Sequence, residues 1–214
     1  MKIITNKSII QYLKQFKVLI WDFDGVIVNS NNIRVNAFYY ALNDFEKFKV
    51  DELLKYHREN GGLSRYAKLD WFFSKFSISI TEEKKKVILK RFSDYCLSRI
   101  SNRQILRNEV MDIIKFFYKE NKIMYIASAS SNDELIKAAK ALKIIDFFNG
   151  ILGSPRNKIQ SIKEIKNLNK KFLNLDFLLI GDAFNDLEAA RKNNIKFLGY
   201  NNDFLSKEKI DYWR

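Results

Sequence analysis

The sequence predicts an α/β protein: a Rossmann-like core on a parallel sheet, with an all-helical segment inserted into it. Short apolar runs that end in Asp, Ser or Gly alternate with longer segments of helical apolar spacing, as in open α/β folds. One stretch, from about Asn32 to Arg99, keeps the helical spacing without an intervening strand. Seven Gly and one Pro in 214 residues argue against a turn-rich β-sandwich or β-barrel.

Strands and core helices are expected in alternation. Short, apolar runs are typical of strands buried on both faces of a parallel sheet. The expected strands are residues 18–21, 123–127, 177–180 and 195–198. The expected core helices are residues 109–121, 132–142, 158–170 and 185–193. Polar residues that follow these strands should meet in one site, because ligands of open α/β sheets bind outside the carboxyl ends of the strands.

The long helical stretch follows the first expected strand, with apolar residues such as Phe38 and Leu42 at helical spacing. A single crossover rarely needs so many residues. We therefore expect a core of residues 1–30 and 101–214 and an inserted helical module of residues 31–100. A set of ordinary crossover helices is the alternative. The many aromatic residues of this module are expected to pack inside it, since they recur at helical spacing.

The composition describes a globular chain with a basic surface. Hydrophobic residues make up 47% of the chain, enough for a sizeable core. The formal net charge is +13, spread along the chain. Such a field favours anionic substrates, although AT-rich coding alone would also enrich Lys. Because no helix-turn-helix, zinc-finger or RNA-recognition pattern is present, we expect no nucleic-acid partner.

Location and assembly are also constrained. The single cysteine, Cys96, permits no internal disulfide and is expected to be a buried small hydrophobe. No run approaches the roughly 20 apolar residues of a membrane span, and polar residues interrupt any signal-peptide core. We expect a cytoplasmic protein without membrane contact, as a monomer or a weak homodimer.

Two carboxylates follow the first expected strand, in the segment Trp21-Asp22-Phe23-Asp24-Gly25. Two positions apart on an extended chain, Asp22 and Asp24 project from the same side. They repel each other unless a cation lies between them or one of them takes up a proton. Carboxylate oxygens suit Mg²⁺, which also binds substrate phosphates. Gly25 allows a tight turn with an exposed amide for a phosphate oxygen.

A second pair of acids, Asp182 and Asp186, follows the third expected strand and Gly181. Four positions apart, they can share one face of a first helical turn and hold a metal from the side opposite the first pair. Acids at a helix start are also ordinary partners of the helix dipole. That alternative explains either acid alone, but not two acidic motifs that both follow apolar strands.

These motifs match a family. Asp-Phe-Asp-Gly-Val-Ile-Val-Asn-Ser at 22–30, with the distant Gly-Asp-Ala-Phe-Asn-Asp at 181–186, closely resembles the haloacid dehalogenase-like superfamily of phosphotransferases. The resemblance covers essentially the whole chain. It is to the branch with a helical (C1-type) cap inserted after the first motif, which includes phosphoglycolate phosphatase and β-phosphoglucomutase. Dehalogenases have one acid in the first motif, so Asp24 indicates phosphoryl transfer.

The resemblance implies a role for each motif residue. Asp22 would be the nucleophile that becomes an aspartyl phosphate, and Asp24 the general acid and then the general base, with its backbone carbonyl toward the metal. The hydroxyl of Ser128 and the amide of Ala129 would bind the phosphoryl group. The implied Mg²⁺ ligands are Asp22, Asp24, Asp182 and Asp186. The implied phosphate- and substrate-binding residues are Gly25, Ser128, Ala129, Lys158 and Arg65.

A cationic residue is needed so that the nucleophile and the phosphate, both anionic, can approach. The resemblance favours Lys158 for this role, because the family places a Lys at the start of a helix there. Arg156 is the alternative, in which case Lys158 would be a surface residue.

The segment Gly61-Gly62-Leu63-Ser64-Arg65 resembles a loop that some capped relatives dip into the active site. Arg65 could clamp a carboxylate, a second phosphate or sugar hydroxyls. It could equally be a surface arginine beside a helix N-cap at Ser64. His57, the sole histidine, is expected to be structural. Arg34 is expected to face the entrance; it stands where mutase-like relatives have a histidine, which disfavours mutase activity.

The sequence therefore predicts a Mg²⁺-dependent phosphatase that hydrolyses a small phosphorylated metabolite through an aspartyl phosphate. A sugar, short polyol or amino-alcohol phosphate is favoured, including precursors of surface glycans. The alternatives are a phosphoglycolate phosphatase and a sugar phosphomutase or phosphotransferase. A phospho-aspartate switch is the non-enzymatic alternative.

Overall fold

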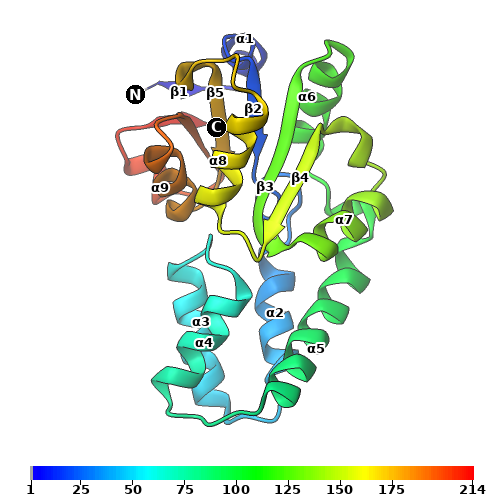
Figure 1. Ribbon diagram of the computed structural model, residues 1–214, viewed down its shortest axis with the longest axis vertical. Coiled ribbons are helices and arrows are strands. Elements are labelled where there is room, and N and C mark those ends of the chain that lie inside the picture. The colour runs from blue at the N-terminus through cyan, green and yellow to red at the C-terminus, as the bar shows by residue number, and fades with distance from the viewer. Residues whose placement is uncertain (1) are drawn as a thin grey trace.

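The computed structural model describes residues 2–214, which form a parallel sheet with helices on both faces and a helical segment at one end (Figure 1). Within these residues the sheet has seven strands in the order β1-β7-β6-β5-β2-β3-β4, and all neighbours are parallel. The strands are β1 (Ile3–Ile4), β2 (Val18–Trp21), β3 (Ile123–Ser131), β4 (Gly150–Ser154), β5 (Phe177–Gly181), β6 (Lys196–Tyr200) and β7 (Asp211–Trp213). The predicted α/β fold is confirmed.

Strands β1, β4 and β7 were not expected from the sequence. β1 and β7 pair with each other and contain two and three residues. Segments this short show no measurable alternation or apolar run. β4 is an edge strand that includes Gly150 and Gly153 and ends at Ser154, so it lacks the apolar run of a central strand.

The central strand β2 shows how both faces of the sheet are covered. Leu19 and Trp21 lie in the apolar core on one face, and Val18 and Ile20 lie in the core on the other, because successive side chains of a strand point to opposite faces. The first face is covered by α1 (Ile9–Lys14), α6 (Asn108–Lys119) and α7 (Asn132–Ala141). The second is covered by α8 (Lys158–Leu168) and α9 (Phe184–Lys192).

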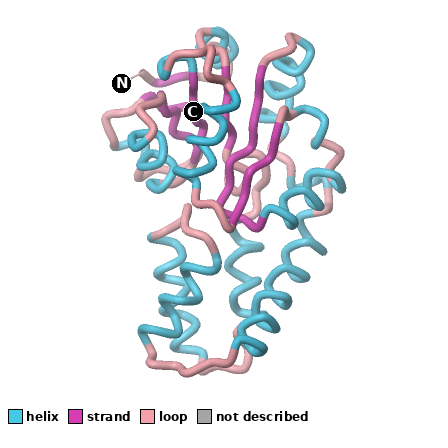
Figure 2. Tube along the Cα trace, viewed as in Figure 1, coloured by secondary structure: helices cyan, strands magenta, loops and turns pink. Residues whose placement is uncertain are grey.

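The helical segment, residues 31–100, follows β2 in the chain and precedes α6, which leads into β3. It consists of α2 (Asn31–Ala41), α3 (Lys47–Glu59), α4 (Arg65–Lys75) and α5 (Glu82–Ile100). α2 packs against α5, and α3 packs against α4 (Figure 2). Aromatic rings fill the space between these helices, as in the edge-to-face contact of Phe45 with Phe72 and the stacking of Tyr56 on Trp71. These rings pack inside the helical segment, as expected from their spacing.

The carboxyl ends of the parallel strands face the helical segment (Figure 1). Trp21, at the end of β2, is in register with Ile126 of β3 and Ile180 of β5. The residues that follow these three strands therefore lie close together at one edge of the sheet. Nowhere in residues 2–214 is there a helix long and apolar enough to cross a membrane.

Candidate active site

Three carboxylates meet where β2 and β5 end. Asp22 follows β2, Asp182 follows β5, and Asp186 lies in the first turn of α9. Each offers a carboxylate oxygen within 4.8 Å of the others, and Asp22 and Asp186 are buried. Hard oxygen donors in this arrangement fit Mg²⁺, which binds carboxylates together with water and phosphate oxygens.

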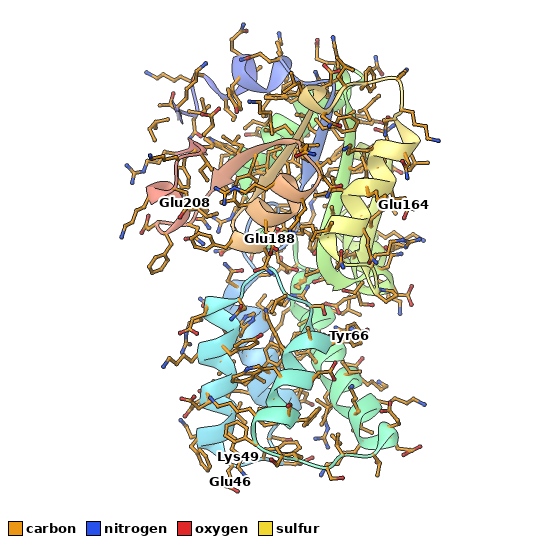
Figure 3. All side chains as sticks on the ribbon, turned by 60° about the vertical axis from the view of Figure 1, so that its left-hand side comes forward. Glu46, Lys49, Tyr66, Glu164, Glu188 and Glu208 are labelled. Carbon is orange, nitrogen blue, oxygen red and sulfur yellow. The ribbon has the colours of Figure 1, made fainter. Side chains whose placement is uncertain are left out.

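Lys158, the first residue of α8, lies against this cluster. Its Nζ is 2.9 Å from Asp22 Oδ1 and also contacts Asp186 Oδ1. The start of α8 is fixed by a capping box, in which Asn157 and Gln160 bond each other's backbone amides. Arg156, the alternative, pairs instead with Glu164 at 2.7 Å. Figure 3 labels Glu164 on α8, at the outer edge of the molecule in that view.

The cluster holds more negative charge than Lys158 neutralises. Burial raises the pKa of Asp22 well above its usual range, and the Asp186 carboxylate raises it further. Burial, with the charge of Asp186, also raises the pKa of Asp182 to about 7. Burial alone would lower the pKa of Lys158, but Asp186 and Asp22 raise it and keep the ammonium charged. A divalent cation at this position would relieve the repulsion.

Asp24 lies in a different environment. Arg34 Nε donates to Asp24 Oδ1 at 3.0 Å and the Arg34 terminal nitrogen donates to Oδ2 at 3.1 Å, a two-pronged contact. The hydroxyls of Ser30 and Ser130 donate to the same carboxylate. Burial by itself would raise the pKa of Asp24, but the Arg34 charge and these hydrogen bonds lower it overall. Asp24 is thus held as a carboxylate.

Gly25 is required by the geometry of the first motif. Its φ is +82°, which favours glycine. A Cβ there would lie 1.9 Å from Asp182 Oδ2. Arg107 Nε donates to the Gly25 carbonyl at 3.0 Å and holds this turn in place. The close approach of the backbone to Asp182 therefore depends on the missing side chain.

Ser128 and Ala129 lie in β3 beside the carboxylates. The buried Ser128 accepts a hydrogen bond from the Ser130 amide at 3.1 Å. The Ala129 carbonyl accepts one from the Ser154 hydroxyl of β4 at 2.6 Å. Both residues line the same cavity as Asp22 and Lys158.

This cavity, of about 740 Å³, lies between the sheet edge and the helical segment. Gly61 and Gly62, in the loop between α3 and α4, line it and lie against Ala183 and Asn185 of the core. Arg65 also reaches the cavity, with its side chain 9% exposed, so it is not a surface arginine. Ser64 caps α4 by accepting from the Ala67 amide, as the alternative interpretation of this loop required.

Glu134 of α7 ties the helical segment to the core. Its buried carboxylate contacts Arg34 of α2 through one oxygen and Arg65 of α4 through the other. Arg34 thus bridges Asp24 and Glu134, and it lines the cavity as a buried residue.

Glu134, Ser130 and Lys68 were not predicted from the sequence. An acid in a first helical turn is ordinary, so nothing in the sequence marked Glu134. Lys68 lines the cavity one turn after Arg65, and that three-residue spacing on a helix could have indicated a shared face. His57, expected to be structural, contacts Lys68 Nζ through Nδ1 at 2.7 Å.

Comparison with known proteins gives the family. The family model of haloacid dehalogenase-like hydrolases matches residues 19–200. The phosphoglycolate phosphatase of Mannheimia succiniciproducens is 24% identical over 196 residues, 86% of this chain and 85% of that protein. The structure of β-phosphoglucomutase from Clostridium difficile has a TM-score of 0.72 and 19% identity, over 92% of this chain and 90% of that one. The magnesium-bound HAD hydrolase YfnB of Bacillus subtilis has a TM-score of 0.67 and 14% identity, over 94% of both chains.

The chain therefore belongs to the haloacid dehalogenase-like hydrolase family, and the resemblance inferred from the two acidic motifs is confirmed. It is an enzyme of that family, a phosphatase, similar in sequence to phosphoglycolate phosphatase. The similarity to β-phosphoglucomutase is one of fold.

Proposed function

We propose that this protein is a Mg²⁺-dependent phosphatase that hydrolyses a small phosphomonoester through a phosphorylated Asp22. The observation that carries the proposal is the position of Asp22. Its carboxylate is buried at the carboxyl end of β2, contacts Lys158 at 2.9 Å, and lines the cavity. A nucleophile in such a site is already desolvated and oriented toward a bound substrate.

The reaction proceeds in two displacements. An oxygen of Asp22 attacks phosphorus, the bond to the leaving oxygen breaks, and Asp24 gives that oxygen a proton. A water molecule then loses a proton to Asp24 and attacks the phosphoryl group on Asp22. Phosphate leaves and both carboxyl groups return to their starting states. The second step needs Asp24 as a carboxylate, the form that Arg34 favours. The first step needs it protonated, so this ion pair must loosen when substrate binds.

The remaining residues of the site bind the transferred group. Lys158, the Ser128 hydroxyl and the Ala129 amide would surround the phosphoryl oxygens, where charge develops in the transition state. The Gly25 amide, expected from the sequence to bind a phosphate oxygen, donates instead to the Val28 carbonyl at 2.8 Å and is therefore not available. The donor set fits Mg²⁺: Asp22, Asp182 and Asp186, with the Asp24 backbone carbonyl, would hold it. Bound there, the ion supplies positive charge to the nucleophile and phosphate. The magnesium-bound relative YfnB supports this cofactor.

Asp186 also contacts Lys158, in addition to its proposed role at the metal site. Its Oδ1 contacts Lys158, and its Oδ2 accepts from the Ala183 amide at 3.1 Å. Both oxygens therefore have protein partners. We propose that Asp186 positions Lys158 and reaches the ion through water.

Residues 31–100 act as the cap of this enzyme. The loop at Gly61 and Gly62 closes over a cavity of about 740 Å³, a size that suits a small metabolite. We propose a sugar, short polyol or amino-alcohol phosphate as substrate, including precursors of surface glycans. Phosphoglycolate is the second candidate, supported by the relative from Mannheimia succiniciproducens.

The test is phosphate release from a panel of small phosphomonoesters, with Mg²⁺ and with a chelator, by the native protein and by Asp22→Asn. We expect turnover that needs Mg²⁺ and disappears in Asp22→Asn, because an amide cannot attack phosphorus. Full turnover by Asp22→Asn, or by the native protein in the chelator, would overturn the mechanism. A long-lived phosphate on Asp22 without turnover would instead indicate a switch.

A further inference from the structure

A buried lysine of the helical segment lines the cavity without a role in the proposed chemistry. Lys68 lies on α4, one turn after Arg65, and is 2% exposed. A lysine is almost never fully buried unless its charge is paired. The ammonium of Lys68 therefore needs a partner.

The partners of Lys68 are both uncharged. Its Nζ contacts His57 Nδ1 at 2.7 Å and donates to the Gly61 carbonyl at 3.3 Å. Burial, with the nearby charge of Lys68, lowers the pKa of His57 to about 3, so the imidazole is neutral and accepts the hydrogen bond. An ammonium has three hydrogens to donate. Two have partners here, and none of the ion pairs found within residues 2–214 includes Lys68.

Two other cations on this side of the cavity are compensated, and a third, Arg58, is exposed to solvent. Arg34 pairs with Asp24 and Glu134, and Arg65 pairs with Glu134. Lys68 has no such carboxylate in contact, and burial lowers its pKa to about 7. Arg65 Nε is a further buried donor without a hydrogen-bond partner in the described chain. An uncompensated buried cation is costly, and an anion brought by a ligand would offset that cost.

The location of Lys68 indicates which part of the ligand it meets. Asp22 and Lys158 lie on the core side of the cavity, whereas Lys68, His57 and Arg65 come from the helical segment opposite. A phosphoryl group on the core side directs the rest of the ester toward the helical segment. We propose that Lys68, positioned by His57, binds a second anionic group carried by the leaving portion of the substrate. The substrate is then the phosphate ester of a hydroxy acid or a bisphosphate. Among the substrates proposed above, this favours phosphoglycolate and a sugar with a second phosphate over polyol and amino-alcohol monophosphates.

This inference rests on the proposed phosphatase function, and matched pairs of esters test both. Each pair differs by the second anion: phosphoglycolate against hydroxyethyl phosphate, and phosphoglycerate against glycerol phosphate. A sugar bisphosphate against the sugar monophosphate separates a phosphate from a carboxylate as that anion. The enzymes are the native protein, Lys68→Met, Lys68→Arg and the control Lys75→Met. Lys75 is on the same helix but pairs with Glu52 and does not line the cavity.

We expect the native enzyme to prefer the anionic member of at least one pair. Lys68→Met should lower kcat/KM for that member about 10- to 100-fold, the effect of losing one charged hydrogen bond. For the member that lacks the second anion, kcat/KM should change less than about threefold. Lys68→Arg should retain much of the preference, and Lys75→Met should match the native enzyme. Thermal unfolding checks that each variant is folded.

Two results would overturn the inference. One is equal use of both members of every pair by the native enzyme; the other is an unchanged preference in folded Lys68→Met. The esters without a second anion report on phosphatase activity alone, so these two results can be told apart from failure of the proposed function. If the proposed function fails, the native enzyme releases phosphate from no ester, and the inference about Lys68 is then wrong as well.

Discussion

Gly62 allows the loop between α3 and α4 to lie against the core, and alanine at this position tests whether that contact is needed for activity. An added Cβ would lie 2.5 Å from Asn185 Cβ. Carbon atoms pack at about 3.5–4.0 Å, so the loop or the start of α9 must move by about 1 Å. Overpacking of this kind costs about 1–3 kcal/mol. If this cost destabilises the state in which the loop lies against the core, kcat/KM drops about 5- to 150-fold.

Gly61→Ala is the matched control. A Cβ at Gly61 would lie 3.5 Å from Ala183 Cβ, an ordinary contact, so this variant should keep near-native kcat/KM. Steady-state phosphate release with the best substrate measures both variants, and Gly62→Ala combined with Asn185→Gly should recover activity because the opposing Cβ is gone. Native activity in Gly62→Ala, or equal losses in the two single variants, would refute the reasoning.

Three further predictions concern charge. The pKa of Asp182 is raised from 3.8 to about 7 in the folded protein, so its ionisation costs stability as pH rises through that interval. Asp182→Asn should therefore raise the Tm of the metal-free protein at pH 8 by about 2–4 °C for each kcal/mol of repulsion relieved, with little gain at pH 4. The same variant should no longer be stabilised by Mg²⁺. An unchanged or lower Tm at pH 8 counts against this prediction. Glu134→Gln leaves Arg34 and Arg65 without their shared carboxylate and should cost about 3–5 kcal/mol in urea unfolding, whereas a loss below about 1 kcal/mol would show the pairing to be dispensable. Arg34→Gln removes the charge that lowers the pKa of Asp24, so the alkaline limb of the kcat/KM profile should move to higher pH, and a shift to lower pH would contradict the assignment of Asp24 as the acid.

The sequence allowed the central strands and the acidic motifs to be predicted because each is a local pattern. An apolar run and the acid that follows it, as at Asp22 or Asp182, are contiguous in the chain. The edge strands β1 and β7 were missed because two or three residues carry no periodicity. Their stability comes from pairing across the sheet, which a local pattern does not record.

The contacts between the helical segment and the core were beyond local patterns as well. Glu134 meets residues 100 and 69 positions earlier in the chain, Arg34 and Arg65. Arg34 and Arg65 were noted as candidates, but their shared partner follows from the fold alone. The pairing of Lys68 with His57 joins two helices in the same way, although the turn that separates Lys68 from Arg65 offered a hint.

The Gly61 carbonyl belongs to the loop that lies against the core, and it is also one of the two acceptors that hold Lys68. Lifting the loop therefore withdraws an acceptor from the ammonium and exposes it to water. If Lys68 binds the leaving portion of the ester, this binding weakens when the loop between α3 and α4 moves away from the core. Opening of the loop and release of the dephosphorylated product would then be coupled through Lys68, as lid opening and product release are in many enzymes.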